Sequence, residues 1–162
     1  MRRLLLLLLI LLPLYLFFSL SFTDKAYFLC PIDYKSTIVI RSDDMGDGLF
    51  ASSRNGGRLH QGVDLFAEVG APVRASRSGI VVQAERNKGM GNFVVIKHPG
   101  NLATVYGHLS EIYVRPRHFI RQGELIGAVG KTGNANYPGI QPHLHFEVRR
   151  GSLVQDPLEY LQ

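Results

Sequence analysis

Two histidines near the C-terminus, His143 and His145, have the spacing that most clearly suggests chemistry. They lie in residues 142–148, where polar and apolar side chains alternate with the period of two that a half-buried β-strand requires. Neutral imidazole is a common zinc ligand and the side chain that titrates nearest neutral pH. Such a strand can give one imidazole to a metal and hold the other beside the metal's open position, and the spacing does not decide which. Two solvated histidines on an exposed face would fit the pattern equally well.

A second group, His60 and Asp64, stands four residues apart with Gly62 between them. Gly62 and the nearby pair Gly56-Gly57 argue against a helix. We therefore expect a chain that bends at Gly62 as it enters a strand and turns both side chains to one point. Imidazole and carboxylate are both good zinc ligands. Taken alone, the pair favours a loop histidine with an unrelated surface aspartate, because such pairs are common.

A further histidine, His108, follows residues 103–106, which alternate in polarity, and it can lie at a strand end that faces the same cleft. Together the three groups offer enough donors for three protein ligands with an open fourth position, which is typical of catalytic rather than structural zinc. The single cysteine, Cys30, excludes an intramolecular disulfide and a cysteine-rich structural zinc site. The sequence therefore favours metal-assisted chemistry based on histidine and carboxylate.

Three ordered motifs resemble the lysostaphin-type (LytM-like) zinc metallopeptidases, which are peptidoglycan endopeptidases. The similarity extends over residues 43–161, and it implies a duplicated hybrid β-motif, one zinc ion per chain and the peptide stems of peptidoglycan as substrate. It also implies that His60, Asp64 and His145 hold the zinc, whereas His108 and His143 act as acid and base. The motifs are His60-x-Gly62-x-Asp64, Tyr106-x-His108-Leu109 and His143-Leu144-His145-Phe146-Glu147, within the similar framework stretches 70–75, 79–81, 123–127 and 130–133.

The resemblance predicts a zinc-dependent endopeptidase that hydrolyses peptide cross-links of bacterial peptidoglycan. Zinc would lower the pKa of its water towards 7 and polarise the scissile carbonyl. Either His143 or His108 would take the proton of that water, and the other would stabilise the oxyanion or protonate the leaving amine. The spacing does not assign the two roles.

One departure from the family supports an alternative function. Residues 134–141, which lead to the His-x-His strand, are longer than the usual link. Together with residues 46–54 they look like the leukocyte chemotaxin branch of the same fold, which is regarded as binding zinc without peptidase activity. That branch lacks the Tyr-x-His element, whereas His108 is present here. The second hypothesis is therefore a non-catalytic zinc-binding envelope module that binds peptidoglycan or activates a partner hydrolase.

The chain as a whole predicts an all-β fold, a two-sheet antiparallel β sandwich or barrel-like sheet. Residues 98–101 predict a hairpin turn, and only residues 157–161 suggest a short helical turn. We expect His98, in that hairpin turn, to be solvated. Tyr106 can orient substrate or pack in the core, and Glu147 can support a ligand or be solvated. The expected strands are 37–40, 63–65, 73–75, 80–83, 93–97, 103–106, 125–129 and 144–148.

The N-terminus carries a charged start and a long apolar run. Met1-Arg2-Arg3 precedes nineteen uncharged residues, Leu4–Phe22, which as a helix span about 28 Å, close to the hydrocarbon core of a bilayer. This predicts a signal anchor or a cleaved signal peptide over residues 1–22, with the arginines cytoplasmic and the remainder in the cell envelope, periplasmic or extracellular. An uncleaved chain would contact the membrane through residues 4–22. We divide the remainder into a linker with a first strand, residues 23–42, and a peptidase domain, residues 43–162.

The net charge is +5, and it falls to +3 when Arg2 and Arg3 are set aside. This mild basic bias suits an anionic polymer such as a cell wall. We expect no nucleic-acid partner, because no basic run with interleaved aromatic residues stands out. The sequence makes no prediction of oligomeric state.

Overall fold

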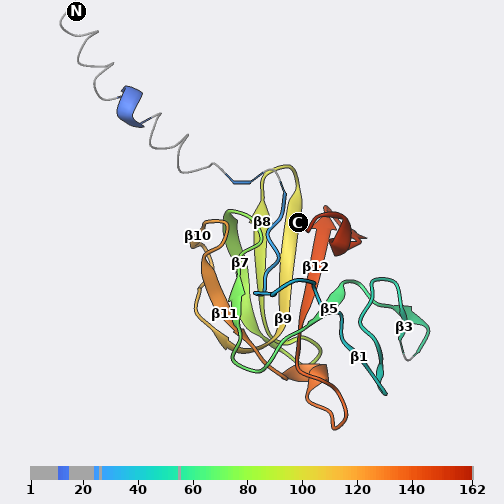
Figure 1. Cartoon of the computed structure of the whole chain (residues 1–162). Coiled ribbons are helices and arrows are strands. Elements are labelled where there is room, and N and C mark those ends of the chain that lie inside the picture. Colours follow the sequence, from blue (N-terminus) through green and yellow to red (C-terminus); the bar gives the residue numbers. More distant parts are fainter. Residues whose placement is uncertain (1–10, 15–23, 26, 55, 162) are drawn as a thin grey trace, which may run out of the picture.

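The computed structural model describes residues 11–14, 24–25, 27–54 and 56–161. Within these residues the chain is almost entirely β-structure, and every ladder between strands is antiparallel (Figure 1). The strands are β1 (Ser42–Asp43), β2 (Gly46–Asp47), β3 (Ser53–Arg54), β4 (Arg58–Leu59), β5 (Val63–Phe66), β6 (Pro72–Arg74), β7 (Gly79–Asn87), β8 (Gly91–His98), β9 (Leu102–Ile112), β10 (Phe119–Ile120), β11 (Leu125–Val129), β12 (His143–Arg150) and β13 (Leu153–Gln155), with short 3-10 helices at Gly133–Ala135 and Pro157–Glu159.

Nine of the described strands form one hydrogen-bonded sheet, and the hairpins β1–β2 and β3–β4 stand outside it. The strands β10, β7, β8, β9, β11 and β6 follow one another in that order, while β12 pairs with β9, β5 and β13. The sheet branches at β9, because residues 102–107 pair with β12 and residues 109–112 pair with β11. The all-β antiparallel prediction is confirmed. In the described part of the chain, however, the strands do not close into a barrel, and one branched sheet takes the place of the two sheets that we expected.

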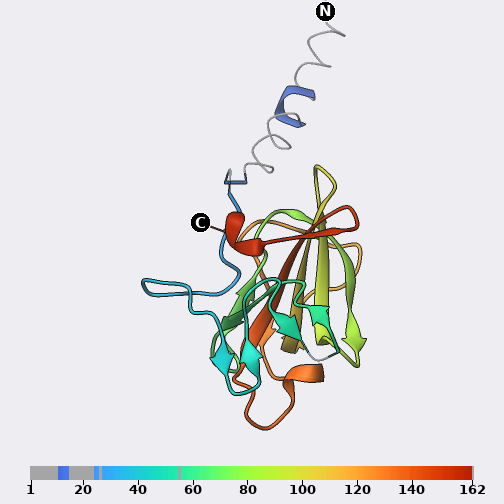
Figure 2. The same cartoon turned by 90° about the vertical axis from the view of Figure 1, so that its right-hand side faces the viewer.

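The strand β12 lies between β9 and β5, and this position organises the site (Figure 1). Its apolar side chains are fully buried in the core, but His143, His145 and Glu147 are buried too, at 3%, 8% and 1% exposure. The expectation of a half-buried strand is therefore wrong. Side chains from residues 41–60 and from β9 meet its polar face, and Figure 2 shows the two small hairpins of this segment on the β5 side of the sheet.

Residues 27–41 pack against the sheet before the first hairpin begins. Phe28 and Ile32 belong to the buried core, and Ile40 bridges to Leu65 on the outer edge of β5. The strand expected over residues 37–40 is reduced to that single bridge, because the chain bends at residues 35–37 just before it reaches β5. The division of the chain near residue 43 stays a prediction.

Most of the predicted signal segment, residues 1–10 and 15–22, lies outside the described residues. Residues 11–14 form one helical turn. Among the residues that the structure describes, no helix is long and apolar enough to cross a membrane. The anchor or signal peptide therefore stays a prediction.

Candidate metal centre and active site

The pairing of β5 with β12 places Asp64 directly opposite His145. Residues that face each other across an antiparallel ladder lie on the same side of the sheet, so this carboxylate and this imidazole meet. His60 reaches them from the turn before β5, where Gly62 lets the chain press against β12. A Cβ atom on Gly62 would lie 2.2 Å from the carbonyl oxygen of Phe146. Close packing therefore requires the glycine of the His-x-Gly-x-Asp motif.

Three donor atoms converge at this point. The Nε2 atom of His60 lies 3.0 Å from Oδ1 of Asp64 and 3.0 Å from Nδ1 of His145, and these last two atoms are 2.9 Å apart. A tetrahedral zinc with bonds of about 2.0–2.1 Å sets its ligand atoms about 3.3 Å apart. The triangle formed by these three donor atoms needs to open only slightly to hold zinc. All three residues are buried. The donor set therefore fits zinc, and the carbonyl oxygen of Leu49 holds the other ring nitrogen of His60 at 2.8 Å.

Each of the two carboxylates at this centre joins a histidine to an arginine. Asp64 uses Oδ1 for the histidines and Oδ2 for two guanidinium groups. Glu147 accepts from Nε2 of His145 through Oε1 at 3.0 Å and binds Arg149 through Oε2 at 2.6 Å. Because the Nε2 proton of His145 is held by Glu147, its Nδ1 atom is left as a donor for a metal. Glu147 therefore supports the imidazole of His145 and is not solvated.

Two more imidazoles, those of His108 and His143, lie beside the triangle. The Nδ1 atom of His108 donates to the carbonyl oxygen of Thr132 at 2.9 Å, and that of His143 donates to the carbonyl oxygen of Gln141 at 2.7 Å. A carbonyl can only accept, so in each neutral ring the Nε2 atom carries the lone pair. The ring of His108 is centred 5.0 Å from that of His143 and 5.7 Å from that of His145. Both are therefore placed to exchange protons with a group bound at the triangle.

His108 occupies the branch point of β9. The ladder with β12 ends at Gly107, the ladder with β11 begins at Leu109, and the register shifts nearby. His108 itself has a φ of 62°, a left-handed conformation that is uncommon outside glycine. These features mark a β-bulge, which re-aims a side chain within a strand. Sequence reasoning expected a strand end here, whereas His108 lies in the middle of the longest strand.

Burial and charge shift the pKa values of the site in opposite directions. Burial would raise the pKa of Asp64, but hydrogen bonds from its two histidine partners outweigh burial and hold that pKa well below its ordinary value. Burial would lower the pKa of His145, but the carboxylates of Asp64 and Glu147 raise it to about 9. Burial, together with the charge of His145, lowers the pKa of His108 to about 3, and burial lowers that of His143. His108 and His143 are thus neutral at pH 7.

The structure brings all five predicted site residues together, although their roles stay proposals. Tyr106 does not join them, because it is fully buried in the core and its hydroxyl accepts a hydrogen bond from the amide of Ser76 at 2.9 Å. The expectation of a solvated His98 is wrong. His98 is 4% exposed, and its ring nitrogens lie 2.9 Å from the carbonyl oxygen of Ser78 and 2.8 Å from the hydroxyl of Thr104. The reason is that β8 extends to His98, so the imidazole lies inside rather than in the turn.

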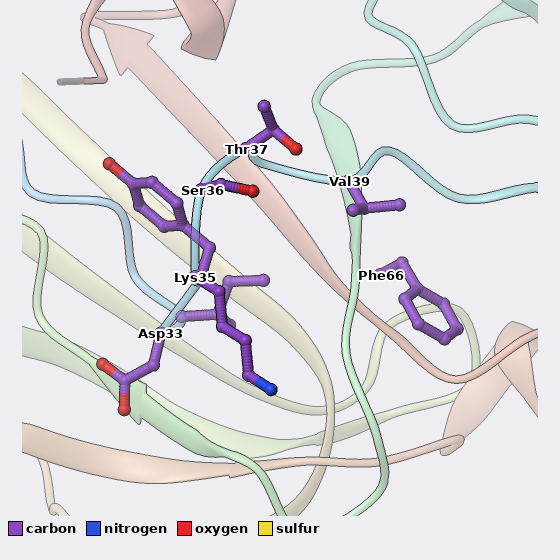
Figure 3. A pocket seen from close by; sticks show the side chains of 8 residues that line it. Asp33, Lys35, Ser36, Thr37, Val39 and Phe66 are labelled. Carbon is purple, nitrogen blue, oxygen red and sulfur yellow. The ribbon is translucent and has the colours of Figure 1, made fainter.

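A separate hollow of about 260 Å³ lies between residues 32–37 and the end of β5. Figure 3 shows Val39 beside Phe66 at this hollow, with Asp33 and Lys35 farther along the same segment. Phe66 pairs with His143 across β5 and β12, so the hollow lies next to the site along the strand. None of the five predicted site residues lines it, and it is therefore not the place where the donor atoms converge.

Residues 58–157 match peptidase family M23, and since this is more than half of the chain, the chain belongs to that family. The membership confirms the resemblance to the lysostaphin-type zinc metallopeptidases. Lysostaphin of Staphylococcus simulans is 37% identical over 123 residues, which cover 72% of this chain and 24% of lysostaphin.

Two further relatives are named as endopeptidases. DD-carboxypeptidase/endopeptidase Mpg of Neisseria meningitidis serogroup B is 44% identical over 101 residues, 62% of this chain and 22% of Mpg. Peptidoglycan DD-endopeptidase ShyC of Vibrio cholerae is 34% identical over 100 residues, 62% of this chain and 22% of ShyC. The matched part thus spans less than a quarter of these relatives.

The fold is also similar to that of a solved structure, a zinc containing peptidase from Vibrio cholerae. The two superimpose with a TM-score of 0.68 at 28% identity, over 83% of this chain and 40% of that one. The structural similarity therefore covers more of the chain than the family match does.

Proposed function

We propose that this chain is a zinc-dependent endopeptidase that hydrolyses peptide cross-links of bacterial peptidoglycan. The proposal is carried by the convergence of His60 Nε2, Asp64 Oδ1 and His145 Nδ1 within 3.0 Å of one another. The similar Vibrio cholerae structure is of a zinc containing peptidase, which supports the metal. The name of ShyC, a peptidoglycan endopeptidase, supports the substrate.

In this proposal His60, Asp64 and His145 hold the metal. Bound zinc supplies a Lewis acid that polarises the scissile carbonyl and acidifies the attacking water. The lone pair on Nε2 of His108 or His143 accepts the proton of that water, and the same proton is available for the leaving amine. The other imidazole can donate a hydrogen bond to the oxyanion only while it carries a proton on Nε2, because its Nδ1–H is held by a backbone carbonyl.

The depressed pKa values of His108 and His143 suit this task. A general base must be unprotonated before the reaction, and burial keeps both rings neutral at pH 7. The Nδ1–H bonds to backbone carbonyls fix the tautomer, so the basic Nε2 atom is the one available. The backbone thus prepares both rings to accept a proton.

We place this activity in the cell envelope, outside the inner membrane, with the peptide stems of peptidoglycan as the partner. The names of two relatives support an envelope setting. ShyC is named as a peptidoglycan endopeptidase, and DipM of Caulobacter vibrioides is named as a cell division protein. The predicted N-terminal signal or anchor would deliver the chain there.

Zinc content and peptidoglycan digestion, measured on the full chain purified in mild detergent, test the proposal. We expect one zinc per chain and new amino termini in cross-linked peptidoglycan, both lost on chelation and regained with zinc. Mass spectrometry of the products would identify the bond that is cut. A chain that binds one zinc but leaves peptidoglycan intact would favour the non-catalytic alternative, and a chain without zinc affinity would exclude both.

A further inference from the structure

The two oxygens of Asp64 have different partners. Oδ1 faces His60 and His145, whereas the partners of Oδ2 among the described residues are arginines. Arg41 donates to Oδ2 from Nε at 3.3 Å and from Nη2 at 3.2 Å, and Arg54 donates from Nη2 at 3.0 Å. The carboxylate is therefore divided into an inner oxygen that faces the histidines and an outer oxygen held by two cations.

Both arginines precede residues 58–157, the part of the chain that matches the family. Three backbone hydrogen bonds fix Arg41 beside Asp64. The amide of Arg41 donates to the carbonyl oxygen of Asp64, and the amide of Gly48 donates to the carbonyl oxygen of Arg41. The amide of Asp64 donates in turn to the carbonyl oxygen of Gly48. Arg41 is 4% exposed, and its Nη1 atom also contacts Asp43 at 2.6 Å. Asp43 in turn accepts from the amide of Gln141, whose carbonyl oxygen accepts from Nδ1 of His143. Residues 41–54, which we call the lead-in segment, therefore contact the site both at Asp64 and at Gln141.

Arg54 reaches the same oxygen from the hairpin β3–β4. It pairs with Arg58 across this hairpin, which leads directly to His60. The side chain of Arg54 is 23% exposed, whereas Asp64 is almost fully buried. Arg54 can therefore be replaced with less risk to folding than the buried Arg41.

A carboxylate without outer partners can rotate and offer a metal either oxygen or both. Guanidinium groups are planar and bind carboxylate oxygens at fixed angles, so two of them on one oxygen hold the plane of the group. Outer partners of this kind orient metal ligands, and their loss typically costs 10- to 100-fold in metal affinity. Two cations also supply the partners that a buried carboxylate needs.

We infer that Arg41 and Arg54 are positioning residues that fix Asp64 as a one-oxygen zinc ligand, so that the complete zinc site begins at residue 41 rather than within the family match. The inference rests on the zinc site of the proposed function. It assigns a role to the lead-in segment that the motifs do not contain.

The test compares zinc affinity, by competition with a chromophoric chelator, for the full-length parent and its Arg54→Gln and Arg58→Gln variants. Arg58 is the matched control, because it lies in the same hairpin, is exposed and carries the same charge. We expect Arg54→Gln to bind zinc about 10- to 100-fold more weakly and Arg58→Gln to match the parent. Arg54→Lys should recover part of the affinity, since an ammonium can still donate to Oδ2.

The absorption spectrum of the Co²⁺-loaded protein provides a readout that a merely structural role would not move. If Asp64 in Arg54→Gln turns to offer both oxygens, the coordination number rises and the visible bands of tetrahedral Co²⁺ weaken. Equal or tighter zinc binding by Arg54→Gln, in a parent that binds one zinc, would overturn the inference and leave the proposed function intact. A parent that binds no zinc would overturn the proposed function, and the inference with it.

Discussion

Two buried histidines of the same sheet, His145 and His98, differ in their partners. At β5 and β12, the imidazole of His145 lies between the carboxylates of Asp64 and Glu147. At the end of β8, His98 lies between a carbonyl and a hydroxyl group. The first histidine has its pKa raised, and the second has its pKa lowered because burial is not offset by a carboxylate hydrogen bond.

The hydrogen bonds of His98 belong to one continuous chain. With a neutral ring, His98 donates from Nδ1 to Ser78 and accepts at Nε2 from the hydroxyl of Thr104, which lies 2.9 Å from the hydroxyl of Tyr106. The Tyr106 oxygen accepts from the amide of Ser76. Each donor in this order meets one acceptor, so the ring has no lone pair left for a ligand. Burial within a polar network therefore leaves His98 without a free lone pair, whereas the neutral rings of His108 and His143 keep theirs on Nε2.

The largest expected effect separates these two histidines completely. His145→Ala removes one of three donors, so we expect the full chain to lose its zinc and its peptidase activity. His98→Ala should keep both and lose about 1–3 kcal/mol of unfolding free energy, because its partners are left buried and unpaired. Metal analysis and chemical unfolding of the two variants check this. A full equivalent of zinc in His145→Ala would reject His145 as a ligand.

A smaller effect should appear at the two imidazoles beside the triangle. We expect His143→Ala and His108→Asn to retain zinc and to lose about 10²- to 10⁴-fold in the rate of cross-link hydrolysis, because each lacks a proton-transfer group. Asparagine is chosen at position 108 because it tolerates the left-handed backbone found there. Steady-state rates and zinc content are the measurements. If His108→Asn digests peptidoglycan as fast as the parent, His108 has no part in the chemistry.

The smallest effect is the pH dependence of stability at His98. Its folded-state pKa lies below the ordinary 6.5, so as the pH falls below 6.5 the unfolded state binds a proton that the folded state does not. The contribution of His98 to the free energy of unfolding is present above pH 6.5. It is lost as the pH falls towards the folded-state pKa, with a slope of up to about 1.4 kcal/mol per pH unit. His108 and His143 act in the same direction, so the parent must be compared with His98→Gln. Equal slopes in the two proteins would contradict the prediction.

The strands could be predicted where hydrophobic runs set them. The prediction for residues 125–129 matches β11 at both ends, while residues 80–83 and 103–106 captured only parts of β7 and β9. The missed parts of β7 are mostly exposed and polar, and pairing with β8, rather than propensity, extends the strand there. The branch of the sheet at β9 depends on which partner each half meets, which no local pattern encodes.

The five site residues could be predicted because each lies in a short motif. The arginines that hold Asp64 could not, because Arg41 is separated from Asp64 by 23 residues and meets it only after β5 has found its edge partner. The sequence allowed Glu147 either to support a ligand or to be solvated. Its burial and its hydrogen bond to His145 show the first. The left-handed backbone of His108 likewise follows from the bulge between two ladders, which forms only in the assembled sheet.

The place of β12 between β5 and β9 also determines when the site comes into existence during synthesis. His145 is added to the growing chain 81 residues after Asp64, and the pairing of β5 with the sheet depends on β12. Contacts between residues so distant in the chain are slow to form, because a long loop must close first. A nascent chain that still lacks β12 therefore has no complete donor set. The proposed hydrolase would remain inert on the ribosome until β12, which carries His145, had been made.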